Sequence, residues 1–265
     1  MWLGLFTGML LSSEQPKGVY VIPDTISLLL APLLIVQGKW VQWRTPRLPE
    51  ADGARRGQLG QGPALSVWIL GDSAAAGVGV KRQHCALSGQ LTTQLGDQFQ
   101  LDWQLRASSG ARTKEMMALL PKQPHRVNAV VLSAGVNDVL STSSAKRWAL
   151  ELDELLHHLR RQHQPELIIL TPLPPMERFP AFPHPLRAWL GKRCHQFNQE
   201  LSRIHQQHPC SQLLSMPHEG ADLAVDQLHP GPASYRLWAA AAAEIIKNRF
   251  ATAQGSSAQA TSATL

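Results

Sequence analysis

The chain of 265 residues has few cysteines, few charged residues and no long apolar run. Its three cysteines, Cys85, Cys194 and Cys210, lie far apart and form no C-x-x-C pair, so the sequence indicates neither a disulfide framework nor a zinc site. Charged residues make up 17% and hydrophobic residues 44%, which is typical of a folded globular chain, and the mean hydropathy of −0.14 excludes a polytopic membrane protein. These absences favour a reducing compartment, and we expect a cytoplasmic protein.

Motifs of several other enzyme classes are also missing. No G-x-S-x-G surrounds Ser73, and no G-x-x-x-x-G-K-[ST] phosphate loop occurs. The pair Gly77 and Gly79 lacks the third glycine of a dinucleotide loop. The 11 histidines form no H-E-x-x-H or H-x-H pair. We therefore expect no cofactor, and no metal in the functional site.

The formal net charge of +6 comes from scattered Lys and Arg residues and not from a basic cluster. A scattered distribution is not the pattern of a nucleic-acid-binding surface. It is weak evidence for an anionic surface, and lipid fits it better than nucleic acid. We expect no nucleic-acid partner.

Two apolar stretches, residues 1–11 and 26–36, occupy the first 45 residues, and each is too short to span a bilayer as an ordinary helix. The second is followed by an aromatic and basic flank: Lys39, Trp40, Trp43, Arg44 and Arg47. Such a flank is typical of a segment that meets lipid headgroups. Two interpretations stay open, namely peripheral attachment at the inner face of the membrane and a helix packed on the domain's own core. Residues 46–63, rich in Pro, Gly, Arg and Gln, are interpreted as a linker.

From residue 64 onward, short apolar runs alternate with longer amphipathic stretches. The expected strands are 65–70, 99–106, 129–133, 167–171 and 212–215. The expected helices are 85–95, 113–120, 144–163, 185–207 and 232–249. This alternation predicts an α/β domain over residues 64–250, with a five-stranded parallel sheet and helices on both faces. Residues 251–265, mostly Ala, Ser, Thr and Gln, are expected to be a disordered tail.

The stretch V-W-I-L-G-D-S-A-A-A-G-V-G-V, residues 67–80, predicts a buried strand that ends at a tight turn containing Ser73. The carboxyl edge of a parallel sheet is where such folds place their ligands. Ser73 is therefore either a helix cap or an exposed nucleophile, and later stretches of the sequence favour the nucleophile.

A serine nucleophile needs a base, a group that orients the base, and donors for the oxyanion. His229 lies in D-Q-L-H-P-G-P before the last helix, with Asp226 three residues earlier. In a turn that closes on itself, this carboxylate reaches Nδ1 of the imidazole and leaves Nε2 facing Ser73. Gly110 follows the second expected strand and Asn137 the third, so both are candidate donors at the same edge.

These four blocks, G-D-S at Ser73, Gly110, G-x-N-D at Asn137 and D-x-x-H at His229, resemble in order the blocks of the SGNH (GDSL-type) hydrolase family, in particular its bacterial esterase and lipase-like members. The resemblance implies a three-layer flavodoxin-like fold, with Ser73 as nucleophile, His229 as base and Asp226 as its orienter. It also implies an oxyanion hole of the Ser73 and Gly110 N–H groups and the Asn137 side chain. The family's leucine after the serine is Ala74 in this chain.

The resemblance implies a serine esterase that hydrolyses carboxylic esters through an acyl-serine intermediate, with a small-molecule ester as its partner. Short acyl groups are expected because the loops after Ser73 and Asn137 are short and no long apolar lid is evident. Two alternatives remain. One is an O-acyltransferase or deacetylase that acts on a sugar, and the other is an inactive SGNH-like binding module.

Overall fold

The computed structural model describes residues 29–216 and 221–262, with side chains as far as residue 250. The first apolar stretch, residues 1–11, lies outside the described residues, as do residues 26–28 of the second stretch and residues 263–265 of the expected tail. The domain boundaries proposed from the sequence stay predictions.

A single sheet of six strands forms the centre of the described chain. The strands are β1 (Arg56–Leu59), β2 (Ala64–Gly71), β3 (Gln100–Ala107), β4 (Ala129–Ser133), β5 (Leu167–Leu170) and β6 (Ser211–Leu213). The expectation of five parallel strands is wrong in one respect, because β1 lies in the segment interpreted as a linker and pairs antiparallel with β3 at the sheet edge. Its sequence R-G-Q-L has no apolar run, so no local sequence pattern predicts a strand there.

The strand order is β1-β3-β2-β4-β5-β6, and β2 to β6 are parallel. Without the edge strand this is the flavodoxin-like order. The chain first adds β3 on one side of β2 and then adds β4, β5 and β6 on the other side. The carboxyl end of the central strand β2 therefore lies at the switch point, where α/β sheets of this kind bind ligands.

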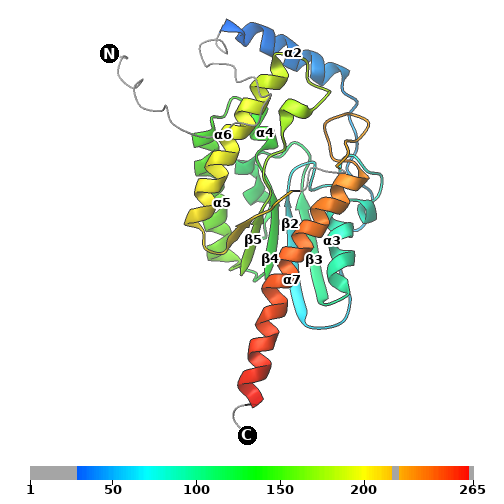
Figure 1. The fold of residues 1–265 in the computed structure, drawn as a ribbon, viewed down its shortest axis with the longest axis vertical. Helices are drawn as coiled ribbons and strands as arrows, with labels where there is room; N and C mark the ends of the chain where they lie inside the picture. The colour runs from blue at the N-terminus through cyan, green and yellow to red at the C-terminus, as the bar shows by residue number, and fades with distance from the viewer. Residues whose placement is uncertain (1–28, 217–220, 263–265) are drawn as a thin grey trace, which may run out of the picture.

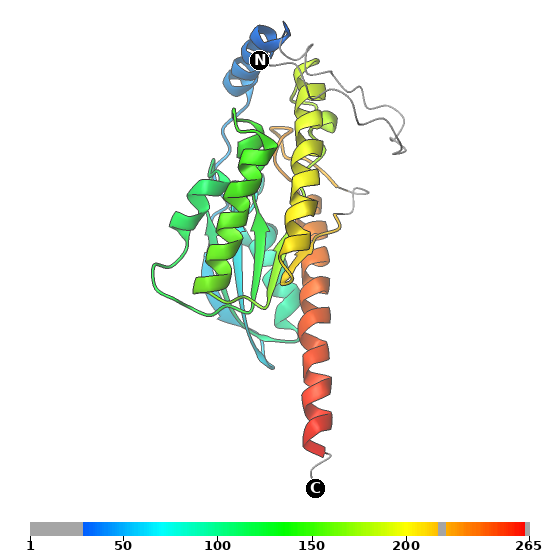
Figure 2. The ribbon, with the colours of Figure 1, turned by 90° about the vertical axis from the view of Figure 1, so that its left-hand side faces the viewer.

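Helices cover both faces of the sheet and give three layers (Figures 1 and 2). The α-helices are α2 (Ala31–Arg44), α3 (Leu87–Gly96), α4 (Val136–Val139), α5 (Ala145–Gln162), α6 (Leu186–Gln207) and α7 (Pro232–Ser262). The pair α5 and α6 packs on one face, and α3 packs with α7 on the other. Among the described residues, no helix is both long and apolar enough to cross a bilayer.

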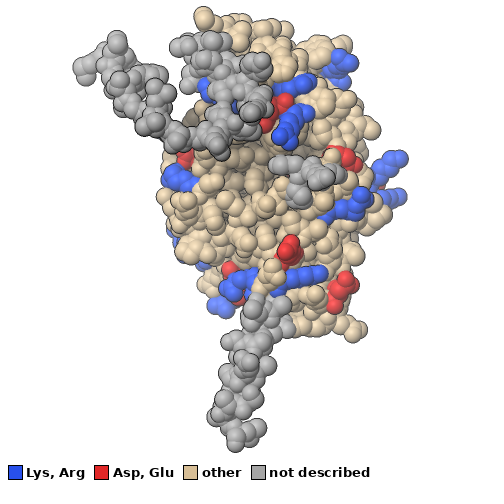
Figure 3. Space-filling model, in the orientation of Figure 1, with Lys and Arg blue, Asp and Glu red and all other residues tan. Residues whose placement is uncertain are grey.

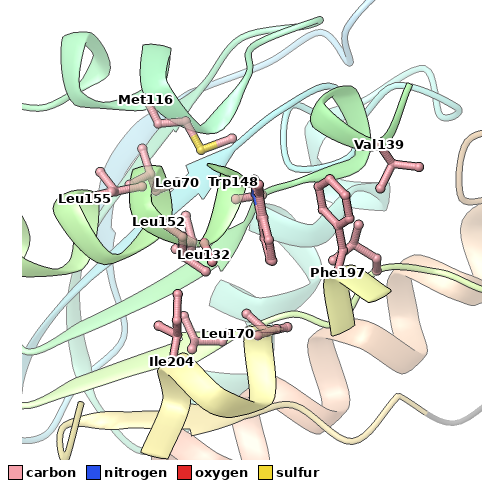
Figure 4. Packing of buried hydrophobic residues seen from close by; sticks show 14 of the residues in the cluster. Leu70, Met116, Leu132, Val139, Trp148, Leu152, Leu155, Leu170, Phe197 and Ile204 are labelled. Carbon is pink, nitrogen blue, oxygen red and sulfur yellow. The ribbon is translucent and has the colours of Figure 1, made fainter. Parts of the chain in front are cut away.

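The alternation of side chains along β2 produces a core on each face of the sheet. Trp68 and Leu70 join the cluster under α5 and α6, whereas Val67 and Ile69 join the cluster under α3 and α7. In the first cluster the leucines of neighbouring strands lie beside Trp148 of α5 (Figure 4). Both faces of the strand are thus apolar, as its uninterrupted apolar sequence predicts.

Three expected helices differ in extent from those observed. Residues 113–120 form a 3-10 helix, η2 (Thr113–Leu119). The expected helix 85–95 is observed as a 3-10 turn, η1 (Gln83–Cys85), followed by α3. A further 3-10 turn, η3 (Met176–Arg178), lies before α6, where no helix was expected. The last helix continues beyond its expected end at residue 249 to Ser262, through residues that the sequence analysis interpreted as part of a disordered tail.

Candidate active site

The turn after β2 presents Ser73 at the carboxyl edge of the sheet. It is held by backbone hydrogen bonds, from Ala76 N–H to Asp72 O (2.9 Å) and from Val78 N–H to Ser73 O (3.0 Å). The Asp72 side chain lies beneath the turn, where it accepts hydrogen bonds from the Ala74 N–H (3.1 Å) and the Ser133 hydroxyl (3.3 Å). Burial raises the pKa of Asp72 to about 6. Asp72 therefore organises the turn, while Ser73 stays partly accessible.

A second loop, between β6 and α7, brings a histidine to this serine. His229 Nε2 lies 2.9 Å from Ser73 Oγ, and His229 Nδ1 lies 2.5 Å from Asp226 Oδ2. Ser73 and His229 are 156 residues apart in the sequence. The structure thus joins the three predicted residues in one hydrogen-bonded chain.

The loop closes on itself as the D-x-x-H spacing predicts. Asp226 Oδ1 accepts hydrogen bonds from the backbone N–H groups of Leu228 (3.1 Å) and His229 (3.0 Å). Ala224 N–H also donates to His229 O at 2.8 Å. Burial alone would raise the pKa of Asp226, but the hydrogen bonds from the His229 ring and from the two backbone N–H groups outweigh it and hold the pKa below its usual value. The carboxylate is therefore ionised at neutral pH.

Two further residues fit the two loops together. Gly79 has φ +110°, and a Cβ atom there would lie 2.3 Å from Pro230 O, so a larger residue would push the histidine loop away from the serine turn. Tyr235 of α7 is fully buried and donates its hydroxyl to Val78 O at 2.6 Å. Burial raises the pKa of Tyr235 well above its usual value, so the phenol stays protonated. The sequence analysis did not single out Tyr235.

The structure also brings together the two other predicted blocks. Gly110 lies in the turn after β3 with φ +80°, a conformation that favours glycine, and this turn is tied to the serine turn by Ser108 N–H, which donates to Gly71 O at 3.2 Å. Asn137, in the short helix α4 after β4, donates its side-chain amide to Ala111 O at 3.0 Å. The loops that carry Gly110 and Asn137 are therefore bonded to each other beside Ser73.

Asp138 anchors these two loops from below and is completely buried. Its carboxylate accepts hydrogen bonds from Thr113 N–H (3.0 Å), from the Thr113 hydroxyl (2.8 Å) and from Arg112 Nε (3.1 Å). The G-x-N-D block thus supplies both Asn137 at the surface of the site and the carboxylate that fixes its position.

Glu50 is a site residue that the sequence analysis missed, because it lies in the expected linker. Glu50 Oε1 accepts hydrogen bonds from Ser109 N–H (2.8 Å) and the Ser109 hydroxyl (2.9 Å), and Oε2 forms an ion pair with Arg55 at 2.7 Å. Burial raises the pKa of Glu50, but the bonds from Ser109 and Arg55 outweigh it and lower the pKa overall. The ionised carboxylate of Glu50 therefore fixes the position of Ser109, the residue next to Gly110.

Among the described residues, one group of side chains has the donor set and spacing to hold a metal ion: Asp153 and His157 of α5 with His208. His208 follows α6 and lies three residues before the start of β6, so the group lies toward the amino edge of the sheet, opposite Ser73. His208 Nε2 lies 2.8 Å from Asp153 Oδ1, which is an ordinary His–Asp pair. This cluster is separate from the residues of the candidate active site.

A three-layer α/β fold with a mostly parallel sheet and a Ser–His–Asp arrangement at its switch point matches the fold of SGNH hydrolases. The chain belongs to the GDSL-like Lipase/Acylhydrolase family, whose sequence model matches residues 69–237, more than half of its length. The matched segment contains all four blocks, from Ser73 to His229. A comparison with curated proteins gave no match.

Solved structures of low sequence identity share this fold. A carbohydrate esterase family 2 enzyme from Corynascus thermopiles is 14% identical, covers 71% of this chain and 67% of its own, and has a TM-score of 0.58. The lipase/acylhydrolase from Enterococcus faecalis is 18% identical over 70% of this chain and 96% of its own, with a TM-score of 0.55. The extracellular lipase from Streptomyces rimosus is 14% identical over 69% and 99%, with a TM-score of 0.54.

Proposed function

We propose that the protein is a serine esterase that hydrolyses carboxylic esters, with short acyl groups preferred, through an acyl-serine intermediate. The observation that carries this proposal is the unbroken chain from Ser73 Oγ through the His229 ring to the Asp226 carboxylate, at 2.9 Å and 2.5 Å. Family membership supports a hydrolase. The same intact chain argues against an inactive binding module.

In the proposed reaction Ser73 Oγ attacks the ester carbonyl carbon while its proton passes to His229 Nε2. Asp226 holds Nδ1–H of the ring and stabilises the imidazolium that forms. His229 then gives the proton to the alkoxide oxygen as the carbon–oxygen bond to the alcohol breaks. Water repeats these steps on the acyl-serine, which releases the carboxylic acid and restores Ser73.

The charge that develops on the carbonyl oxygen needs donors placed in advance. We assign this role to the N–H groups of Ser73 and Gly110 and to the Asn137 side-chain amide. The bond from Asn137 to Ala111 O supports the assignment, because it uses one of the two amide hydrogens and fixes the direction of the other. No metal ion takes part in this scheme.

A substrate panel tests the function. We expect p-nitrophenyl acetate and butyrate to be cleaved faster than the palmitate ester, because the loops after Ser73 and Asn137 are short and the sequence has no long apolar lid. Release of free acid from a simple ester, measured with and without added alcohol or acetylated sugar, separates hydrolysis from transfer. A preference for palmitate would contradict the acyl-length proposal, and acyl transfer without hydrolysis would favour the acyltransferase alternative.

Glu50→Gln should lower kcat while leaving KM nearly unchanged. The amide oxygen of Gln can still accept both Ser109 bonds at the position of Oε1, but its NH₂ group then faces Arg55, so the ion pair is lost and the Gly110 turn is held less firmly where the oxyanion forms. The loss of about 1–2 kcal/mol corresponds to roughly 5- to 30-fold in kcat. Asn137→Ala removes an oxyanion donor outright and should lower kcat roughly 100- to 1000-fold, so it serves as the reference for the smaller effect of Glu50→Gln.

The matched control for Glu50 is Asp52→Asn, the same chemical change two residues away. Asp52 is exposed and its ion pair with Arg82 is long, at 4.0 Å, so we expect the parent kcat. Equal losses in both variants, or a rise in KM with unchanged kcat for Glu50→Gln, would contradict a positioning role for Glu50.

A further inference from the structure

Helix α2 (Ala31–Arg44) is apolar on two opposite faces. Its inner face buries Leu34 and Val41 in the core cluster under α6. Its outer face carries a stripe of exposed apolar side chains at alternating spacings of four and three residues: Leu29, Leu33, Val36, Trp40 and Trp43. A helix that only covers a soluble domain is normally polar on its outer face. Packing among the described residues therefore does not explain the stripe.

Polar bonds fix the inner face of α2, so its outer face has a defined direction. Gln37 Nε2 donates to His184 O at 2.8 Å, and Leu186 N–H donates to Gln37 Oε1 at 3.1 Å. These contacts tie α2 to the start of α6. Within the part of the chain that the structure describes, Leu29 and Trp43 at the two ends of the stripe remain 82% and 83% exposed.

The charges beside the stripe are all of one sign. Helix α2 contains no Asp or Glu, whereas Lys39 and Arg44 lie on either side of the stripe and Arg47 follows the helix. The Arg44 guanidinium lies over the Trp40 ring at 5.0 Å. Figure 3 shows uncharged surface at the end of the molecule where Figure 1 places α2, with several Lys and Arg side chains and some acidic surface below it.

We propose that the outer face of α2 docks the enzyme on a membrane surface that contains anionic lipid. Exposed Leu and Val side chains would enter the boundary between headgroups and acyl chains, Trp rings would sit at headgroup level, and the flanking cations would attract lipid phosphates. A second copy of the chain fits less well, because two such helices packed on each other would bring their cationic flanks together.

The docking surface adjoins the candidate active site, and this part of the inference rests on the proposed function. A pocket of about 350 Å³ lies between α2, residues 180–183 and the loop that carries Asp226. Trp40 and Arg44 contribute to its lining together with Val225 and Gln227. Docking through α2 would hold this pocket close to the lipid surface, so we infer that esters partitioned at the membrane surface are the substrate class.

The test is sedimentation of the full chain with vesicles of phosphatidylcholine containing about 30% phosphatidylglycerol, at about 50 and 500 mM salt. We expect the parent protein to sediment at low salt, to be released several-fold at high salt, and to bind pure phosphatidylcholine weakly. The double variant Val36→Asp/Trp43→Asp should lose at least about tenfold in partitioning, because both changes place charge in the stripe. Lys39→Glu/Arg47→Glu should lose most of the salt-dependent part.

Leu150→Asp is the matched control, since Leu150 is 63% exposed but lies on α5, and it should bind vesicles like the parent. None of the altered residues lines the pocket, so hydrolysis of soluble p-nitrophenyl acetate and the melting temperature should stay near parent values in every variant. A parent protein that stays in the supernatant at low salt, or a stripe variant that binds undiminished, would overturn the docking proposal. Vesicle binding without esterase activity would refute the proposed function and leave the docking surface intact.

Discussion

Ser73→Ala abolishes ester hydrolysis in the proposed mechanism, with an expected fall in kcat on the order of 10⁶-fold. The variant removes the oxygen that attacks the ester, and His229 cannot replace it. The fold should survive, because Ser73 is partly accessible and its hydroxyl bonds the His229 ring, which lies in a loop and not in the core. Initial rates on p-nitrophenyl acetate measure the effect, and a thermal melt checks the fold.

Covalent labelling gives this prediction a second readout. A fluorophosphonate should label the parent protein at one site and leave Ser73→Ala unlabelled. Ser202→Ala is the matched control, because Ser202 is an exposed serine on α6 that bonds only its own helix, and it should keep both activity and labelling. If Ser73→Ala retained full activity, the nucleophile would have to be another residue.

Asp226→Asn should reduce kcat on the order of 10⁴-fold while binding of substrate changes little. The two backbone N–H groups that bond Oδ1 favour the amide oxygen at that position, so the amide NH₂ must face His229 Nδ1. Nδ1 then acts as an acceptor and the proton moves to Nε2, which faces Ser73. The ring in this tautomer cannot take the serine proton, and steady-state kcat and KM measure the loss.

Asp153→Asn is the control for this change, because Asp153 also pairs with a histidine, His208, but toward the amino edge of the sheet, away from Ser73. It should keep the parent kcat. Comparable losses in both variants would show that the effect reflects general destabilisation and not the tautomer of His229.

Asp226→Asn should also change the stability of the fold, and the direction of the change depends on pH. The folded-state pKa of Asp226 lies below the ordinary carboxyl value of 3.8, so the stabilising contribution of its charge is fully present above pH 3.8 and is lost as the pH falls through the folded pKa. Melting temperatures of the parent and Asp226→Asn should therefore differ at pH 7 and converge in acid. A constant difference across this range would contradict the charge-based explanation.

The sequence by itself determined the parallel core of the sheet and which residues form the hydrogen-bonded chain with Ser73, namely His229 and Asp226. Uninterrupted apolar runs such as 129–133 signal buried strands locally, because both faces of such a strand meet a helix layer. Residues that follow those strands must meet at one edge, so Ser73, Gly110 and Asn137 could be grouped without coordinates. The D-x-x-H spacing likewise predicts the Asp226–His229 contact, which depends only on a short turn.

Tertiary structure alone decided the features that have no local pattern. Strand β1 carries no apolar run, so its pairing with β3 depends on an edge that exists only once the sheet has formed. Glu50 reaches Ser109 across 59 residues. The outward direction of the α2 stripe depends equally on distant contacts, since Gln37 bonds residues 147 and 149 positions away. Periodicity reports the burial of one segment, whereas long-range pairing depends on how separate segments meet in space.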